Sequence, residues 1–118
     1  MQVIKNREHF FQILAENPGL VIIKFGASWC GPCKLIEAAV DKYFKQMPNN
    51  VQCMSIDIDD SFDIYAFLKS KKMINGIPAI LCYNKGNDSY VPDEFVSGAN
   101  LQQIADFFDA CLKNASVV

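Results

Sequence analysis

The chain has 118 residues, 51% of them hydrophobic and 20% charged, and its formal net charge is −2. These values indicate one globular domain, 1–118, with a core of its own, and they exclude a disordered chain. The small negative charge gives no basic surface for nucleic acid or anionic membranes. The first residues lack the apolar core of a signal peptide, and no apolar run could span a bilayer. We therefore expect a soluble, cytoplasmic protein that binds neither nucleic acid nor membrane.

The first half of the chain alternates between helical and strand patterns. The expected elements are a short possible strand at 3–4, a helix at 7–17, a strand at 20–26, a helix from 33 to about 47 and a strand at 51–58. The stretch LVIIKFG at 20–26 is rich in β-branched residues and does not alternate, which is typical of a strand covered on both faces. Pro18-Gly19 ends the helix before it.

The second half adds two helices and two strands. We expect a helix from 61 to about 71, a strand at 79–84 that follows Pro78, a strand at 94–96 and a final helix. Asn100 caps that helix, with Gln103 placed as in a capping box. Strand–helix–strand units predict parallel pairing, and the late strand–turn–strand predicts an antiparallel addition. The fold class is α/β, with a central mixed sheet of about five strands flanked by about four helices.

Two cysteines stand in the stretch SWCGPCK, 28–34. The stretch follows the buried strand and opens a helix, so Cys30 lies at a helix N-terminus, where free N–H groups and the helix dipole favour a thiolate. Cys33 lies one turn further, faces back toward Cys30 and is expected to be the more buried of the two. Gly31-Pro32 shapes the turn between them. The pattern predicts a reversible disulfide with an exposed nucleophile and a sheltered resolving thiol.

A zinc clamp is the competing interpretation of the cysteine pair. Zinc would need a second pair of Cys or His ligands, and the chain has one histidine, His9. An odd total of five cysteines also argues against a secreted scaffold held by disulfides. The other three are expected to be small buried side chains: Cys53, Cys82 and Cys111. Asp57, Asp59 and Asp60 lack the rest of a calcium loop and are expected to be solvated. We expect no metal site.

The motifs WCGPCK at 29–34, NGIPA at 75–79 and VSGAN at 96–100, with the order of elements, resemble the thioredoxin family over nearly the whole chain. The resemblance implies a thioredoxin fold and protein-disulfide reductase activity, in which Cys30 attacks and Cys33 resolves. It also implies that Pro78 is the cis-proline of the family and that the backbone of Ile77 pairs with a bound substrate strand. The residues that match the substrate-docking surface are Trp29, Gly31, Pro32, Gly76, Ile77, Pro78, Gly98 and Ala99.

The resemblance also implies the partners. They are protein disulfides as substrates and a separate thioredoxin reductase as electron donor, since no nicotinamide or flavin motif is present and no cofactor is expected. The Gly-Pro spacer favours a reducing potential near roughly −270 mV, and we expect a monomer. Two alternatives stay open at this point: a thiol oxidase or isomerase of an oxidising compartment, and a thioredoxin-fold binding module whose redox activity is incidental.

Lys24 departs from the family pattern, which has a buried aspartate at this position. An ammonium group in a strand covered on both faces is costly unless it is paired or reaches water. It can stay charged and either extend toward the Cys33 side or pair with an acid such as Glu37 or Asp57. Alternatively, it is neutral and takes the proton of Cys33. In both cases Lys24 is a candidate catalytic residue. Ala38 also replaces a family proline in the helix.

Overall fold

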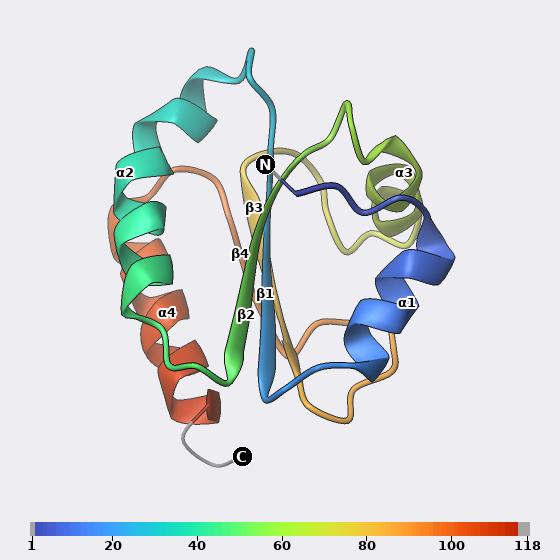
Figure 1. Ribbon diagram of the computed structural model, residues 1–118. Helices are drawn as coiled ribbons and strands as arrows, with labels where there is room; N and C mark the ends of the chain where they lie inside the picture. Colours follow the sequence, from blue (N-terminus) through green and yellow to red (C-terminus); the bar gives the residue numbers. More distant parts are fainter. Residues whose placement is uncertain (1, 116–118) are drawn as a thin grey trace.

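The computed structural model describes residues 2–115, and Figure 1 shows a central sheet between two layers of helices. Within these residues the helices are α1 Arg7–Ala15, α2 Gly31–Gln46, α3 Phe62–Ser70 and α4 Leu101–Ala115. The strands are β1 Leu20–Gly26, β2 Val51–Asp57, β3 Ala79–Asn84 and β4 Glu94–Ser97. Each helix and strand predicted from 7 onward is present, with ends that differ from the prediction by at most two residues. This is the thioredoxin fold expected from the sequence.

The strands form one mixed sheet in the order β2-β1-β3-β4. β1 and β2 are parallel, as predicted, and β4 adds antiparallel to β3. The prediction of parallel pairing is wrong for β3, which runs antiparallel to β1 and begins where β1 ends, with Ala79 opposite Phe25. The reason lies in the connection. The helix α3 has only nine residues, or about 14 Å, and the loop 71–78 returns the chain to the same end of the sheet.

The possible strand at 3–4 is not formed. Gln2 makes an isolated parallel bridge to Ile56 at the edge of β2, and the pairing stops there. The next inward residue, Ile4, is buried and donates its N–H to Ser61 Oγ at 2.9 Å, so the backbone turns away from the ladder toward α3. The sheet therefore has four strands in residues 2–115, where about five were expected.

The central strand β1 divides the core into two layers. Side chains alternate between the two faces of a strand. Val21, Ile23 and Phe25 pack on the α1 and α3 side, whereas Leu20 and Ile22 pack on the α2 and α4 side. All seven residues of β1 are buried, as the sequence predicts. Each fully buried aliphatic side chain contributes about 1.5–3 kcal/mol, so this strand fixes the platform from which the cysteine pair extends.

Candidate active site

The cysteine pair lies at the junction of β1 and α2. Cys30 is the N-cap residue of α2, which therefore begins at Gly31, two residues before the predicted start. Pro32 falls in the first turn, where its missing N–H costs nothing because that donor has no partner inside the helix. The Cys33 N–H donates to Cys30 Sγ at 3.2 Å, so a backbone donor of the helix terminus points at the sulfur. A negative charge on that sulfur is stabilised by this donor and by the helix dipole.

Cys30 and Cys33 are joined by a disulfide, with their Cα atoms 5.3 Å apart. Both residues are 5% exposed, so the prediction that Cys30 is the more exposed one is wrong for this oxidised state. The physical reason is that both sulfurs sit under the same turn. Gly31 and Pro32, which form that turn, are exposed above them.

The segments 76–78 and 98–99 approach Cys30 from the neighbouring strands. The Ile77–Pro78 peptide bond is cis, as the resemblance implied, and the Ile77 carbonyl oxygen lies 4.0 Å from Cys30 Sγ. Gly98 donates its N–H to the Pro78 carbonyl at 2.9 Å and has a φ of 87°, a left-handed conformation that glycine adopts without strain. The hydrogen bond joins the two segments, so residues 98–99 are held next to the segment whose Ile77 carbonyl lies near the Cys30 sulfur.

Trp29 and two aspartates fix the loop that carries Cys30. Trp29 is 65% exposed, and its Nε1–H donates to Asp59 Oδ2 at 2.9 Å. Asp57 accepts hydrogen bonds from the N–H groups of Ser28, at 3.2 Å, and Asp59, at 2.8 Å. Sequence reasoning missed this role, because it treated both acids as solvated. The available signal was their position at the end of a strand parallel to β1, since parallel strands end at the same edge of a sheet.

The residues predicted to dock substrate differ in exposure. Pro78 is buried and Ile77 and Ala99 are half-buried, whereas the others are exposed: Trp29, Gly31, Pro32, Gly76 and Gly98. A side chain added at Gly31 or Gly76 would meet no atom within 4 Å, so the surface around both glycines is open. Of these residues, Trp29 precedes Cys30 in the chain, the Ile77 carbonyl lies near Cys30 Sγ, and Gly98 is hydrogen-bonded to Pro78. Their part in binding substrate stays a prediction.

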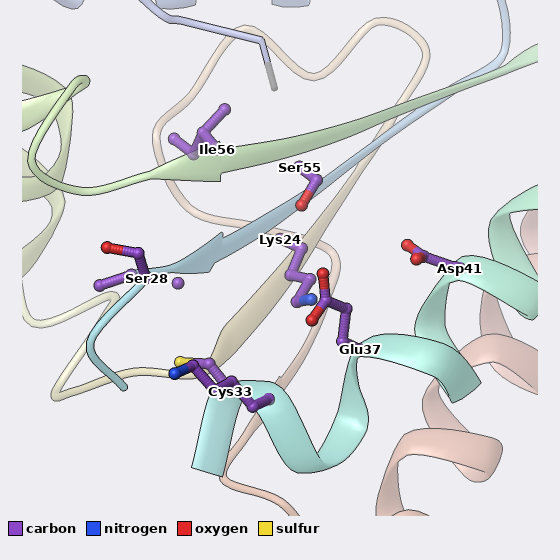
Figure 2. A pocket seen from close by; sticks show the side chains of 10 residues that line it. Lys24, Ser28, Cys33, Glu37, Asp41, Ser55 and Ile56 are labelled. Atoms are coloured by element: carbon purple, nitrogen blue, oxygen red, sulfur yellow. The ribbon is translucent and has the colours of Figure 1, made fainter. Parts of the chain in front are cut away.

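A pocket of about 290 Å³ lies behind the pair, between the ends of β1 and β2 and the first turns of α2. Lys24 is only 6% exposed, and Figure 2 shows its amine directed into this pocket toward Glu37. Among residues 2–115 it forms no ion pair within 4.0 Å. The second predicted partner, Asp57, uses its carboxylate for the backbone of the loop. Lys24 therefore shares a pocket with Cys33 and Glu37, and the two alternatives for its charge and its role stay predictions.

The remaining cysteines are free thiols. Cys82 and Cys111 are fully buried, in agreement with the prediction of small buried side chains, whereas Cys53 is only half-buried. Burial and the neighbouring Cys82 raise the pKa of Cys53 to about 11. A hydrogen bond with Cys82, followed by burial, raises the pKa of Cys111. In the part of the chain that the structure describes, no group of three or more His, Cys, Asp or Glu is placed to hold a metal. No helix there is long and apolar enough to span a membrane.

A disulfide that caps a helix beside an X-Pro segment has one established chemistry. It exchanges with other disulfides, because a thiolate at the helix terminus attacks a substrate sulfur that approaches across the open surface. The fold and the pair thus define a thiol–disulfide oxidoreductase.

Comparisons with known proteins agree with this assignment to the thiol–disulfide oxidoreductases. The family model described as Thioredoxin matches residues 1–110. Mouse thioredoxin is 35% identical over 109 residues, which cover 88% of this chain and 91% of the mouse protein. The crystal structure of thioredoxin from Trypanosoma brucei brucei has a TM-score of 0.72 at 24% identity, covering 96% and 91% of the two chains. Oxidised mitochondrial thioredoxin 3 of Saccharomyces cerevisiae has a TM-score of 0.72 at 23% identity, covering 93% and 94%.

The chain belongs to the thioredoxin family. It is a protein-disulfide reductase whose redox-active pair is Cys30 and Cys33.

Proposed function

We propose that Cys30 is the attacking thiolate and Cys33 the resolving thiol in the reduction of protein disulfides. The observation that carries this order is the N-cap position of Cys30, whose sulfur accepts the Cys33 N–H at 3.2 Å. The thiolate at Cys30 forms a bond to one substrate sulfur, and the other substrate sulfur leaves as a thiolate. Cys33 then attacks Cys30, the mixed disulfide breaks, and the second substrate sulfur leaves. Two electrons pass to the substrate, and the Cys30–Cys33 disulfide remains.

The substrate is proposed to be an extended protein segment that carries a disulfide. Its backbone pairs with Ile77, whose carbonyl oxygen lies 4.0 Å from Cys30 Sγ, so the substrate sulfur is held over the attacking group. Exposed small residues and one exposed aromatic side chain surround this point, which suits a flat contact with backbone. The docking surface comprises Trp29, Gly31, Pro32, Gly76, Ile77, Pro78, Gly98 and Ala99.

A separate thioredoxin reductase is the proposed electron donor, in line with the family to which the chain belongs. Reduction of Cys30–Cys33 reverses the steps above, with the thiols of the reductase as nucleophile. We propose that residues 1–118 act as one domain and as a monomer, since protein partners need the face around Cys30. A cytoplasmic location is proposed because Cys53, Cys82 and Cys111 are free thiols, the state that a reducing compartment maintains.

Insulin reduction in the presence of dithiothreitol tests the activity. The wild-type chain is expected to accelerate precipitation of the insulin B chain, whereas Cys30→Ser with Cys33→Ser is the matched inactive control. A binding module with incidental redox activity would give equal rates for the two proteins, and that result would refute the proposal. Light scattering of the full chain measures the oligomeric state, and cell fractionation measures the compartment.

A further inference from the structure

The pocket behind Cys33 contains charged side chains that the docking surface does not use. Lys24 and Gly26 lie on the same face of β1, since they are two residues apart in a strand. A Cβ on Gly26 would stand 3.5 Å from Cys33 Sγ, so this sulfur rests against the strand at Gly26. Lys24 is the next residue along that face. Its side chain therefore runs beside the resolving cysteine.

The helix α2 brings a carboxylate to the same place. Cys33 and Glu37 are four residues apart and share one face of the helix. Both line the pocket together with Lys24, and Figure 2 shows the Lys24 amine directed toward the Glu37 carboxylate. Glu37 is exposed at the rim, so it exchanges protons with solvent. The pocket, at about 290 Å³, has room for water and polar groups that would bind it.

The other charged groups around the pocket are less well placed for Cys33. The helix α2 also contributes Lys34, adjacent to Cys33 and exposed, and Asp41, a further turn away from it. β2 contributes Ser55 and Ile56, which carry no charge. Asp57 follows on β2, but its carboxylate is held by two backbone N–H groups. Glu37 is therefore the carboxylate one helical turn from Cys33, with a buried ammonium facing it.

We propose that Glu37 accepts the Cys33 proton in the resolving step and that Lys24 is the positioning residue for Glu37. The inference rests on the proposed order of attack by Cys30 and resolution by Cys33. The Cys33 thiol gives its proton, through water in the pocket, to the Glu37 carboxylate. The Cys33–Cys30 bond forms, the bond from Cys30 to the substrate sulfur breaks, and the substrate leaves as a thiolate. Glu37 then returns the proton to the leaving thiolate or to solvent. When the reductase opens the disulfide, the same carboxyl group protonates Cys33.

Lys24 positions the Glu37 carboxylate for the proton transfer from Cys33. Its ammonium group is nearly surrounded by protein and has no ion pair within 4.0 Å among the described residues of the oxidised protein. Attraction between this cation and Glu37 draws the carboxylate from the rim toward Cys33, because opposite charges interact more strongly away from bulk water. An ammonium at this place also favours the Cys33 thiolate, the species that attacks.

A stopped-flow reaction of the reduced full chain with dithiodipyridine separates the two steps. Attack by Cys30 releases a first equivalent of thiopyridone, and resolution by Cys33 releases a second. Cys33→Ser should abolish the second release. Glu37→Gln should slow it by about 10²-fold, the usual contribution of a positioned acid–base group, and should make it rise more steeply between about pH 6 and about pH 9, because Cys33 must then lose its proton to solvent. Lys24→Met should slow it by on the order of tenfold and shift its pH profile, and Lys24→Arg should restore most of the rate.

Asp41→Asn is the matched control, because it removes the same charge from the same pocket one turn away. It should change the second release by no more than about twofold. Equal rates and pH profiles for Glu37→Gln and wild type would overturn this inference while leaving the proposed function intact. Equal losses in both releases would also overturn it, since they would indicate general damage to the site. If the wild-type chain gave no second release that depends on Cys33, the proposed function itself would fail.

Discussion

The five cysteines occupy two environments, and the difference lies in what surrounds each sulfur. Cys30 and Cys33 sit at the N-terminus of α2, under an exposed turn and next to a backbone N–H donor. Cys82 on β3 and Cys111 on α4 have no exposed surface, and Cys82 is close enough to raise the pKa of Cys111. Both pairs bring two sulfurs together. Only the Cys30–Cys33 pair has a backbone N–H donor that can stabilise a thiolate and an exposed turn that a partner protein can approach.

This contrast shows that nearness of two thiols is not sufficient for redox function. Thiol–disulfide exchange needs a thiolate, and burial in apolar surroundings opposes its formation. Hydrogen bonding and burial raise the pKa of Cys111, and burial raises the pKa of Cys53 to about 11. The helix terminus has the opposite effect on a thiol placed there. The same residue type is thus favoured as a thiolate at the helix terminus and as a neutral thiol at the buried positions.

The largest expected effect is that of removing the resolving thiol. Cys33→Ser should lose turnover with protein disulfides and should accumulate a mixed disulfide through Cys30, since attack survives and resolution does not. Non-reducing electrophoresis and peptide mapping of the adduct measure this. An adduct through Cys53, Cys82 or Cys111 would contradict the division between the two environments.

Alkylation rates compare the two environments directly. With iodoacetamide at about neutral pH, Cys30 of the reduced protein should react at least about a hundredfold faster than Cys53, because only the thiolate fraction reacts. Mass spectrometry of quenched samples gives the rate at each site. The same labelling in denaturant is the control, and there the rates should converge. Comparable rates in the folded protein would show that the pKa contrast is absent.

A smaller effect is expected from the acid that holds Trp29. Asp59→Asn weakens the acceptor of the Trp29 Nε1–H, and one hydrogen bond contributes about 0.5–1.5 kcal/mol. We expect kcat/KM for a protein disulfide to fall about two- to tenfold, with little change for a small disulfide. Asp60→Asn is the matched control, because Asp60 is exposed and its carboxylate does not hold the tryptophan. A similar loss in both variants would show that the hydrogen bond from Trp29 to Asp59 has no specific role.

The smallest expected effect is the pH dependence of stability due to Cys53. Its pKa is raised from 9.0 to about 11 in the folded protein, so the unfolded chain releases this proton first as pH rises. The contribution of Cys53 to the free energy of unfolding is therefore complete below about pH 9 and is lost toward about pH 11. Urea unfolding at several pH values should show a shallower fall for Cys53→Ala than for wild type. If the free energy of unfolding fell equally with pH in the two proteins, folding would not raise the pKa of Cys53.

Local sequence signals predicted much of the fold and part of the site. The unbroken β-branched run gave the buried strand β1, and Asn100 caps α4 through the Gln103 N–H at 2.9 Å, as expected. The change from a buried-strand pattern to a helical pattern also placed Cys30 at the helix terminus. These features depend on neighbours in the chain, and the physics of strands, caps and turns is local.

The features that sequence reasoning missed depend on distant contacts. The direction of β3 follows from where the loop 71–78 returns, which no residue pattern in the strand itself encodes. The tether from Asp59 to Trp29 spans 30 positions, and the contact of Cys82 with Cys111 joins a strand to the last helix. For Lys24 the sequence offered both Glu37 and Asp57 as partners, and the orientation toward Glu37 depends on how α2 packs on β1. Such contacts depend on how distant elements pack together, and local patterns in a single sequence do not specify that packing.

Trp29 gives the protein a built-in optical probe. It is the one tryptophan of the chain, so emission excited selectively from indole arises at a single known place. That place is adjacent in sequence to Cys30, largely exposed, and fixed in orientation by Asp59. Opening of the disulfide, arrival of a partner and movement of the active-site loop all change the surroundings of this ring. The spectrum of the unlabelled protein therefore follows the redox cycle in real time.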